Sequence, residues 1–333
     1  IIGVDLIRTG KDDFYVLEDN CRTPSGVSYM LENREIMMKM FPDLFHSNRV
    51  LRVDDYPTRL LQTLMSLAPK KCDSSVPTVV LLTPGHLNSA YYEHTFLSDQ
   101  MGIEMVEAQD LFVENDFLYM KTVDGPKKID VVYRRIDDDY LDPLAYNPNS
   151  VIGVPGITHV YKTGGVNICS APGAGIADDK AVYIYVPEMI KFYLGETPIL
   201  DNVQTWRCER DDDLKYVLEN IDELVIKEVD GSGGHGMLIG PKSTKQEIED
   251  FSSKLKLHPE GYIAQPTLDL SSSPTLIDNE ISGRRVDLRP FCLLGEKVQL
   301  CPGGLTRVAL GKGSYVVNSS QGGGVKDTWV LAD

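Results

Sequence analysis

A glycine-rich segment that follows a lysine is the part of the sequence best suited to binding phosphate. The run Gly231-Ser232-Gly233-Gly234-His235-Gly236 lies between residues 224–229 and 237–240, two stretches rich in β-forming residues. A dinucleotide-binding turn would need a helix after the glycines, so this pattern predicts a glycine-rich hairpin instead. Backbone N–H groups without Cβ atoms can approach a polyphosphate closely, and Lys227 could neutralise its charge. The same pattern also fits a plain hairpin without a ligand.

Oxygen-bearing side chains near the N-terminus suggest a cation site. If a hairpin turns at Lys11-Asp12, residues whose numbers add up to 23 face each other, so Asp5 lies opposite Glu18. Asn20 is two residues from Glu18 and shares its face. Hard oxygen ligands of this kind suit Mg²⁺ that is held jointly with phosphates. A solvated acidic face is the alternative, and a slip of one residue would break the arrangement.

Two arginines near the C-terminal end could bind anions. Arg289 alternates with apolar neighbours along residues 285–291, and Arg307 lies on a later element. Their planar guanidinium groups could hold a transferring phosphoryl group and a substrate carboxylate. Structural pairing with carboxylates such as Asp287 is the alternative.

The elements that must position these side chains begin with two units. Residues 1–20 are predicted to form a hairpin, and residues 30–67 show helical periodicity before a linker at 68–77. Residues 79–82, 89–101 and 103–107 are typical of strand, helix and strand, which implies a parallel sheet. A strand over residues 129–134 ends in a charged run at 134–139, which fits either a site or a solvated loop.

A third unit begins near residue 170. A loop at residues 171–175 leads into a helix capped by Asp178 or Asp179, and residues 245–255 are predicted to be helical. Residues 286–294 and 298–301 are predicted to pair as strands around Gly295-Glu296.

Composition limits the class of protein. The 333 residues include 33 Lys and Arg against 49 Asp and Glu, a formal charge of −16, which argues against nucleic-acid binding. No apolar run approaches the ~18 residues of a membrane span. Six cysteines without a Cys-x-x-Cys pair indicate reduced thiols and a cytoplasmic location. The chain opens with Ile1-Ile2 and no initiator Met, so we expect a fragment or a trimmed chain.

Several segments together resemble a known family. They are residues 16–29, 82–85, 88–94, 133–139, 177–180, the glycine run, 287–291 and 318–330. Their combination is similar to the circularly permuted branch of the ATP-grasp superfamily, which includes glutathionylspermidine-synthase-like proteins and many uncharacterised bacterial proteins. The order supports permutation, because the Asp…Glu-x-Asn metal element comes last in linear members and first here.

The resemblance implies an α/β (α+β) fold: a circularly permuted ATP-grasp fold with an inserted Rossmann-like pre-ATP-grasp domain. Residues 1–70 would form the permuted metal-binding part with its helices. Residues 71–170 would form the inserted α/β domain, and residues 171–333 the nucleotide-binding region.

The resemblance also implies roles for individual residues. ATP would be bound by Lys180, Lys227, Gly231, Ser232, Gly233, Gly234, Gly236, Gln265 and Leu268, the last two on the strand that presents its backbone to adenine. Phosphoryl transfer would be served by Arg289 and Arg307, and Mg²⁺, with two ions expected, by Asp5, Glu18 and Asn20. The substrate side would involve Asn88, Tyr91, Arg134, Arg135 and Asn318.

The activity implied is that of an ATP-dependent carboxylate–amine ligase working through an acylphosphate. Its partners would be small-molecule or peptide carboxylates and amines, without nucleic acid or membrane. The absence of a G-x-S-x-G or Cys/His signature agrees with chemistry that needs no protein nucleophile. Two alternatives remain open: an ATP-binding pseudoenzyme that acts through partners, and a phosphotransferase to a small acceptor.

Overall fold

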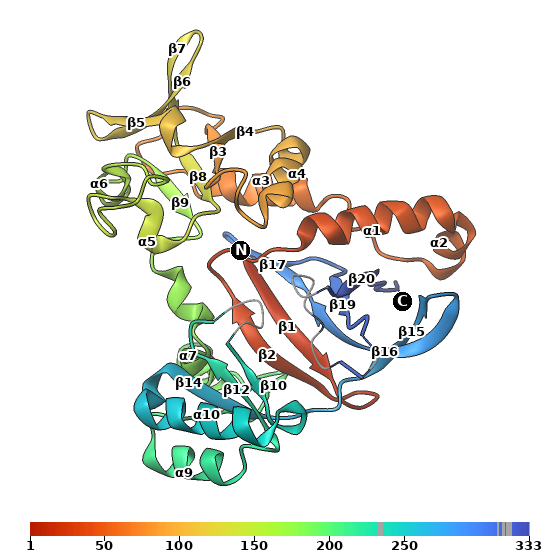
Figure 1. Cartoon of the computed structure of the whole chain (residues 1–333). Helices are drawn as coiled ribbons and strands as arrows, with labels where there is room; N and C mark the ends of the chain where they lie inside the picture. The colour runs from red at the N-terminus through yellow and green to blue at the C-terminus, as the bar shows by residue number, and fades with distance from the viewer. Residues whose placement is uncertain (232–235, 312, 315–316, 318–321, 333) are drawn as a thin grey trace.

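The β1–β2 hairpin lies within the largest sheet of the molecule. The computed structural model describes residues 1–231, 236–311, 313–314, 317 and 322–332. The main path of this sheet has the order β10-β2-β1-β16-β19-β20. Its strands are β1 (Ile2–Arg8), β2 (Phe14–Asn20), β10 (Asp201–Asn202), β16 (Glu280–Arg289), β19 (Leu305–Val308) and β20 (Gly324–Asp327). Strands from both ends of the described chain therefore meet in one sheet, as Figure 1 shows in red and blue.

Pro290 divides the strand that we expected over residues 286–294. It separates β16 from β17 (Phe291–Leu294), because proline has no N–H with which to continue the ladder. β17 pairs with β1 and with β18 (Val298–Leu300), which confirms the turn predicted at Gly295-Glu296. β15 (Ser272–Ile277) pairs with the first part of β16.

A second, smaller sheet carries the lysine of the glycine-rich segment. Its order is β11-β14-β12-β13, with β11 (Trp206–Arg207), β12 (Leu224–Glu228), β13 (Leu238–Ile239) and β14 (Tyr262–Pro266). β12 and β13 are antiparallel, so the predicted hairpin is confirmed. Helices α9 (Asp211–Glu219) and α10 (Lys245–Leu257) cover this sheet (Figure 1). The short turns η3 (Gly240–Lys242) and η4 (Pro259–Gly261) flank α10.

The middle of the chain forms an α/β unit. Its parallel sheet has the order β4-β3-β8-β9, with β3 (Val79–Leu82), β4 (Glu104–Val106), β8 (Val131–Arg134) and β9 (Asn167–Cys169). The parallel pairing of β3 with β4 across α4 (Tyr91–Met101) confirms the predicted β-α-β unit. Beside it lie η1 (Ala108–Asp110), α5 (Asp138–Leu141), α6 (Ile157–Lys162) and the antiparallel β5 (Leu111–Glu114), β6 (Phe117–Thr122) and β7 (Gly125–Ile129). The predicted strand at 129–134 is thus divided, since β7 ends at Ile129.

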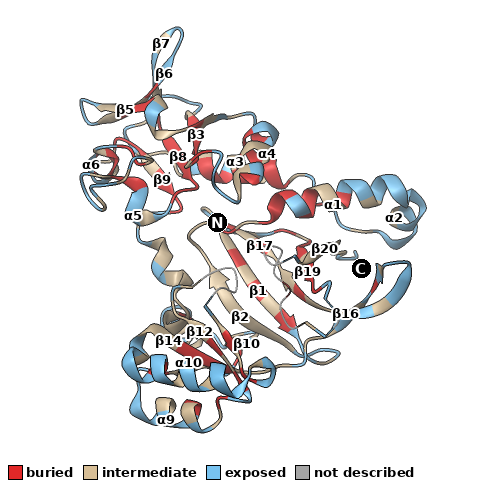
Figure 2. Ribbon diagram, viewed as in Figure 1, coloured by how far each residue is buried: buried red, intermediate tan, exposed pale blue. Residues whose placement is uncertain are grey.

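Three helices occupy the region 30–67, where the sequence shows helical periodicity. They are α1 (Val27–Met40), α2 (Pro42–Asn48) and α3 (Tyr56–Ser66). Pro42 begins α2, and Arg49 ends it in the left-handed conformation. Figure 2 shows that α2 and the outer half of α1 are exposed, whereas α3 is buried against the body. One hydrophobic core contains residues of α1, α3, β3, β8 and β17, so the α/β unit and the large sheet are packed as one body.

A short helical connection lies beside β2. It consists of η2 (Ala174–Asp178), α7 (Lys180–Tyr183) and α8 (Val186–Leu194). The Asp179 side chain accepts hydrogen bonds from the N–H groups of Ala181 and Val182, which confirms it as the cap of α7. None of the helices in the described parts of the chain is long and apolar enough to span a lipid bilayer. All six cysteines are free thiols.

Candidate functional site

The β1–β2 hairpin brings Asp5 and Glu18 together. The register pairs Gly3 with Asn20 and Asp5 with Glu18, as the turn geometry predicts. A β-bulge then shifts the register between Asp5 and Leu6, so Leu6 faces Val16. The two carboxylates are therefore neighbours. Between the bulge and the turn, each residue of β1 faces a residue of β2 one position earlier than the turn geometry predicts.

Asp5 is bound by the two arginines. Its side chain is completely buried; Arg289 donates to both carboxylate oxygens, and Arg307 Nη2 donates to Oδ2 at 2.6 Å. Burial alone would raise the pKa of Asp5, but the charges of Arg289 and Arg307 lower it. The two oxygens predicted to bind Mg²⁺ thus accept hydrogen bonds from guanidinium groups, so we expect Asp5 to be ionised and to hold the arginines.

Arg307 has a second carboxylate partner. Its Nε donates to Asp287 Oδ1 at 2.9 Å, across the β16–β19 pair in which these residues face each other. The structural pairing left open for the arginines is therefore present for Arg307 with Asp287, and Arg289 pairs with Asp5 instead. A chain of alternating charges, Asp287–Arg307–Asp5–Arg289, crosses three adjacent strands of the large sheet.

Glu18 faces two lysines from the other side of the site. Lys180 Nζ lies 3.8 Å from Glu18 Oε2 and donates to the carbonyl oxygen of Gly231 at 2.5 Å. Burial and the neighbouring Asp5 raise the pKa of Glu18, while the charges of Lys227 and Lys180 act against that rise. Glu18 on β2 and Lys227 on β12 therefore belong to one charged cluster between the two sheets, although they are far apart in sequence.

Lys227 is a half-buried cation whose direct partner is neutral. Its Nζ donates to Gln265 Oε1 at 2.8 Å, and Gln265 Nε2 donates to Thr205 Oγ1 at 3.1 Å. Burial and the charge of Lys180 lower the pKa of Lys227. A bound anion would stabilise the charged form of Lys227, because it would offset the loss of hydration on burial.

Asn20 completes the set of groups that could hold Mg²⁺. Asn20 would bind the ion through Oδ1, while its buried Nδ2, which has no hydrogen-bond partner among the described residues, could donate to a phosphate oxygen. No group of three or more His, Cys, Asp or Glu in the described parts of the chain could hold a metal ion by itself. Glu18 and Asn20 fit a Mg²⁺ ion that takes its remaining ligands from phosphates and water, which is how this ion is usually bound beside nucleotides.

The glycine-rich segment is described only at its ends. Gly231 contacts Lys180 through its carbonyl oxygen, and Gly236 has a φ of +69° beside the Glu228 side chain. The predicted residues Ser232, Gly233, Gly234 and Asn318 lie outside the described residues. Gln265 is buried on β14, and Leu268 follows that strand as a half-buried residue.

Arg134 and Arg135, predicted for the substrate side, are engaged by the protein instead. The fully buried Arg134 donates to the carbonyl oxygens of Ser170, Ile136 and Ala171. Arg135 is also buried and donates to Pro24, Ser25, Tyr133 and Glu93. Both guanidinium groups therefore hold the fold around the site.

Asn88 and Tyr91 lie at the start of α4. The exposed Asn88 accepts a hydrogen bond from the N–H of Ala90 through Oδ1, and Tyr91 is half-buried. None of the hydrogen bonds found among the described residues joins either side chain to the Glu18–Lys227 cluster. Glu93 on the same helix lies within the stretch 88–94 that the sequence marked, but it was not singled out, and its carboxylate is bound by the start of α1.

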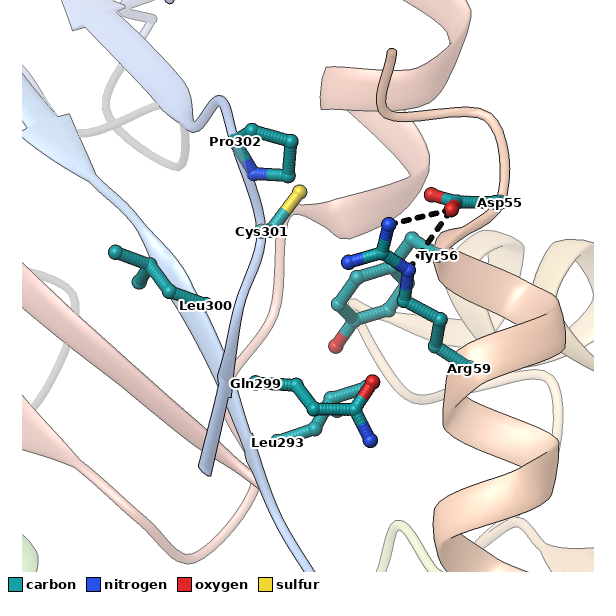
Figure 3. Close-up of a pocket in the computed structure, with 8 residues that line it drawn as sticks. All are labelled: Asp55, Tyr56, Arg59, Leu293, Gln299, Leu300, Cys301 and Pro302. Atoms are coloured by element: carbon teal, nitrogen blue, oxygen red, sulfur yellow. Dashed lines mark hydrogen bonds and ion pairs between the residues drawn. The ribbon is translucent and has the colours of Figure 1, made fainter. Parts of the chain in front are cut away.

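A small pocket lies elsewhere, between α3 and the β17–β18 pair. It is lined by residues that include Tyr56, Gln299 and Cys301. Asp55 and Arg59 also line it, and Figure 3 shows them joined as an ion pair. Their N–O distance is 2.6 Å. None of the predicted site residues lines this pocket, so it is separate from the charged cluster.

Comparisons with known proteins give a family and several relatives. A family model described as circularly permuted ATP-grasp type 2 matches residues 1–309. An uncharacterised protein of Synechocystis sp. is 54% identical over 332 residues, covering 99% of this chain and 69% of its own length. An uncharacterised protein of Mycobacterium bovis is 53% identical over 334 residues, covering 100% of this chain and 60% of its own length.

A third relative and one solved structure complete the comparison. A Frankia casuarinae protein, provisionally named glutamate–cysteine ligase 2-2, is 40% identical over 333 residues, which cover 99% of this chain and 38% of that protein. The chain thus spans between 38% and 69% of the length of these three relatives. A glutathione synthetase-like effector from Globodera pallida has a TM-score of 0.63 at 11% identity, covering 99% of this chain and 75% of its own, a likeness of fold alone.

Proposed function

The chain belongs to the circularly permuted ATP-grasp type 2 family, and from this premise we propose that it is an ATP-dependent ligase that joins a carboxylate to an amine. The observation that carries the proposal is the half-buried cluster of Glu18, Lys180 and Lys227 between the two sheets. A half-buried lysine with a neutral partner, beside an acidic group and an amide nitrogen without a partner among the described residues, is an arrangement that a magnesium triphosphate would complete.

Each member of the cluster has a proposed role in binding. Lys180 and Lys227 would neutralise phosphate oxygens, and the backbone of the glycine-rich segment would lie over them. Glu18 and Asn20 would hold Mg²⁺ together with the phosphates. When bound, this ion supplies positive charge that offsets the charge of the transferring phosphoryl group. The strand β14 would present its backbone to the adenine ring.

The reaction we propose has two steps. An oxygen of the substrate carboxylate attacks the γ-phosphorus of ATP, and the bond to ADP breaks to leave an acylphosphate. The amine nitrogen then attacks the acyl carbon, phosphate leaves, and the nitrogen loses a proton to give the amide. Arg289 and Arg307 would act through positive charge, since most of their N–H groups already donate to Asp5, Asp287 and Ser25.

The substrate class is also a proposal. The provisional glutamate–cysteine ligase name of the Frankia relative directs the search to amino acids, as donors of both the carboxylate and the amine. The chain covers only 38% of that relative, so its name does not fix the substrate. The first panel should therefore be broad and contain amino acids, dipeptides and polyamines.

The test measures ADP release from Mg²⁺-ATP across this panel, followed by mass spectrometry of the products. An amide together with free phosphate supports a ligase, whereas a phosphorylated acceptor identifies a phosphotransferase. Nucleotide binding by calorimetry without ADP release for any pair would favour an ATP-binding module. Lys227→Met should abolish nucleotide binding, and Lys215→Met on the exposed face of α9 is the matched control.

A further inference from the structure

The segment that follows the Glu18 strand is held by contacts from several elements. Residues 21–26 connect β2 to α1, and they begin one residue after Asn20. At the first end, Asp178 Oδ1 accepts hydrogen bonds from the N–H groups of Cys21 at 2.6 Å and Arg22 at 3.0 Å. This end is therefore tied to the turn that precedes Lys180.

The second end of the segment is held by the α/β unit. Glu93 Oε2 accepts from the N–H groups of Gly26 at 2.6 Å and Ser28 at 3.1 Å, and from Ser28 Oγ at 3.0 Å. Because Gly26 and Ser28 form the start of α1, a carboxylate from another helix satisfies N–H groups that the helix cannot pair itself. The Glu93 side chain is only 3% exposed.

Arg135 connects Glu93 to the same segment. Its Nη1 donates to the carbonyl oxygen of Pro24 at 2.8 Å, and its Nη2 donates to Ser25 Oγ at 2.6 Å and Glu93 Oε1 at 3.2 Å. The guanidinium group is 1% exposed and lies over the Tyr133 ring. A buried and rigid fork thus fixes both the main chain at Pro24 and the side chain of Ser25.

Ser25 joins this pair to the candidate active site. Its carbonyl oxygen accepts a hydrogen bond from Arg289 Nη1 at 3.1 Å, while Arg289 also donates to Asp5. Pro24 and Arg289 both pack closely against Gly3. A Cβ at Gly3 would lie 3.0 Å from Pro24 Cβ and 3.3 Å from Arg289 Cδ. The position of residues 24–25 therefore limits where the Arg289 guanidinium can lie.

We propose that Arg135 and Glu93 are positioning residues, which hold residues 24–26 and through Ser25 set the place of Arg289 in the site. The α/β unit would then contribute to phosphoryl transfer although neither side chain faces the Glu18–Lys227 cluster. The kinetic part of this inference rests on the proposed function. The structural part, the dependence of Arg289 on Arg135, does not.

The test compares three variants. Arg135→Lys keeps the charge beside Glu93 but cannot bridge Pro24, Ser25 and Glu93 together. Ser25→Ala is the milder change: it removes the hydrogen bond from Arg135 to the side chain and the one from the Ser25 hydroxyl to the carbonyl oxygen of Thr23, and it keeps the Arg135 guanidinium. Ser28→Ala is the matched control: it removes one hydrogen bond to the same Glu93 without changing the contact from Ser25 to Arg289.

Two measurements are made on each variant. The first is the arginine Nε–Hε signal of Arg289 in NMR spectra, assigned by its loss in Arg289→Lys; it should shift in Arg135→Lys and Ser25→Ala and stay in place in Ser28→Ala. The second is ADP release, for which kcat should fall about 5-fold or more in the first two variants. The KM for ATP should be unchanged, since Lys180 and Lys227 are untouched.

The outcomes separate this inference from the proposed function. A shifted Arg289 signal in a protein without detectable turnover would leave the positioning role in place and reject the ligase. An unshifted signal in Ser25→Ala and in folded Arg135→Lys would overturn the positioning role, whatever the turnover. Equal shifts in Ser28→Ala and Ser25→Ala would also overturn it, because they would indicate a general loosening of the start of α1.

Discussion

At the scale of single residues, Asp5 and Glu18 differ in role although they face each other. Asp5 lies between two guanidinium groups, whereas Glu18 lies beside Asp5 and two lysines. We predict that Asp5→Asn lowers the free energy of unfolding by about 3–5 kcal/mol, with or without Mg²⁺, because Arg289 loses its counter-charge and Arg307 keeps only Asp287. Glu18→Gln should cost much less, since burial and Asp5 already disfavour its charge. Urea unfolding of both variants measures this, and equal losses would contradict it.

A second residue-scale prediction concerns His94 and pH. His94 is buried, its Nδ1 lies 2.9 Å from Thr83 Oγ1, and burial together with the charge of Arg135 lowers its pKa to about 3. The folded protein therefore keeps His94 neutral, whereas the unfolded chain takes up a proton below pH ~6.5. The resulting loss of stability begins as pH falls through 6.5 and ends near pH 3.

The variant His94→Asn tests this, because asparagine places a polar atom near Nδ1 but does not titrate. We expect the variant to be less stable than the wild type at pH 7.5, and this difference to shrink by about 2 kcal/mol at pH 5. Urea unfolding at both pH values gives the four free energies needed. A difference that is independent of pH would show that His94 accepts a proton in the folded state.

The sequence could predict some of these residues and not others. The pairing of Asp5 with Glu18 follows from turn position and from the two-residue period of a strand, so it was predicted correctly despite the bulge. The partners of Arg289 and Arg307 depend on the register between β16, β19 and β1. Asp287, which the sequence offered as a partner of the arginines, does pair with Arg307. The contacts of both arginines with Asp5 depend on the place of β1 beside the C-terminal strands, which are almost the whole chain away, and no local pattern specifies it.

At the scale of elements, the cap of α7 positions Lys180. Asp179 accepts from two N–H groups of this short helix, and Lys180 is its first residue. Asp179→Ala should lower stability by about 1 kcal/mol and weaken nucleotide binding several-fold, because the first turn that carries Lys180 would fray. Thermal unfolding and calorimetry with Mg²⁺-ATP measure the two effects. Asp211→Ala is the control, since Asp211 lies in the first turn of α9 without capping it; a similar loss of nucleotide affinity there would refute the assignment.

Element boundaries were predictable where proline or glycine marks them. The strand–turn–strand at β17–β18 and the hairpin at β12–β13 were predicted correctly, because Gly295 and the glycine run interrupt clear β patterns. The division of the strand at Pro290 into β16 and β17 was not predicted, although a proline has no N–H group and so marks a possible break. The break between α1 and α2 is weaker in the sequence, since apolar residues continue through Phe41 and the exposed end of α1.

At the scale of the whole molecule, the resemblance of several segments predicted the ATP-grasp fold and the order of the motifs predicted its permutation, which the family match confirms; the fold likeness agrees. The order of motifs is a property of the chain and can be read directly. The packing of the α/β unit against the large sheet could not be read, because it depends on a shared core and on the buried Glu93–Arg135 pair. Such contacts join segments whose local patterns are those of ordinary helices and strands.

The last described residues are tied to the first helices through Arg34. Its Nε donates to Asp327 Oδ2 at 2.8 Å, and its Nη1 and Nη2 donate to the carbonyl oxygens of Leu51 and Thr328 at 2.7 Å. The side chains of Arg34 and Asp327 are 5% and 1% exposed. This one guanidinium group therefore connects α1, the segment before α3 and the end of β20.

We predict that Arg34→Ala lowers the free energy of unfolding by about 3–5 kcal/mol, because it leaves the buried Asp327 carboxylate without its cation. Arg52→Ala is the control: Arg52 forms an ion pair with Asp54, but their side chains are 80% and 59% exposed, so its loss should cost at most about 1 kcal/mol. Urea unfolding gives both values, and amide exchange should be faster at β20 in the first variant alone. Equal small losses would mean that the shared core, rather than Arg34, joins the two ends of the described chain.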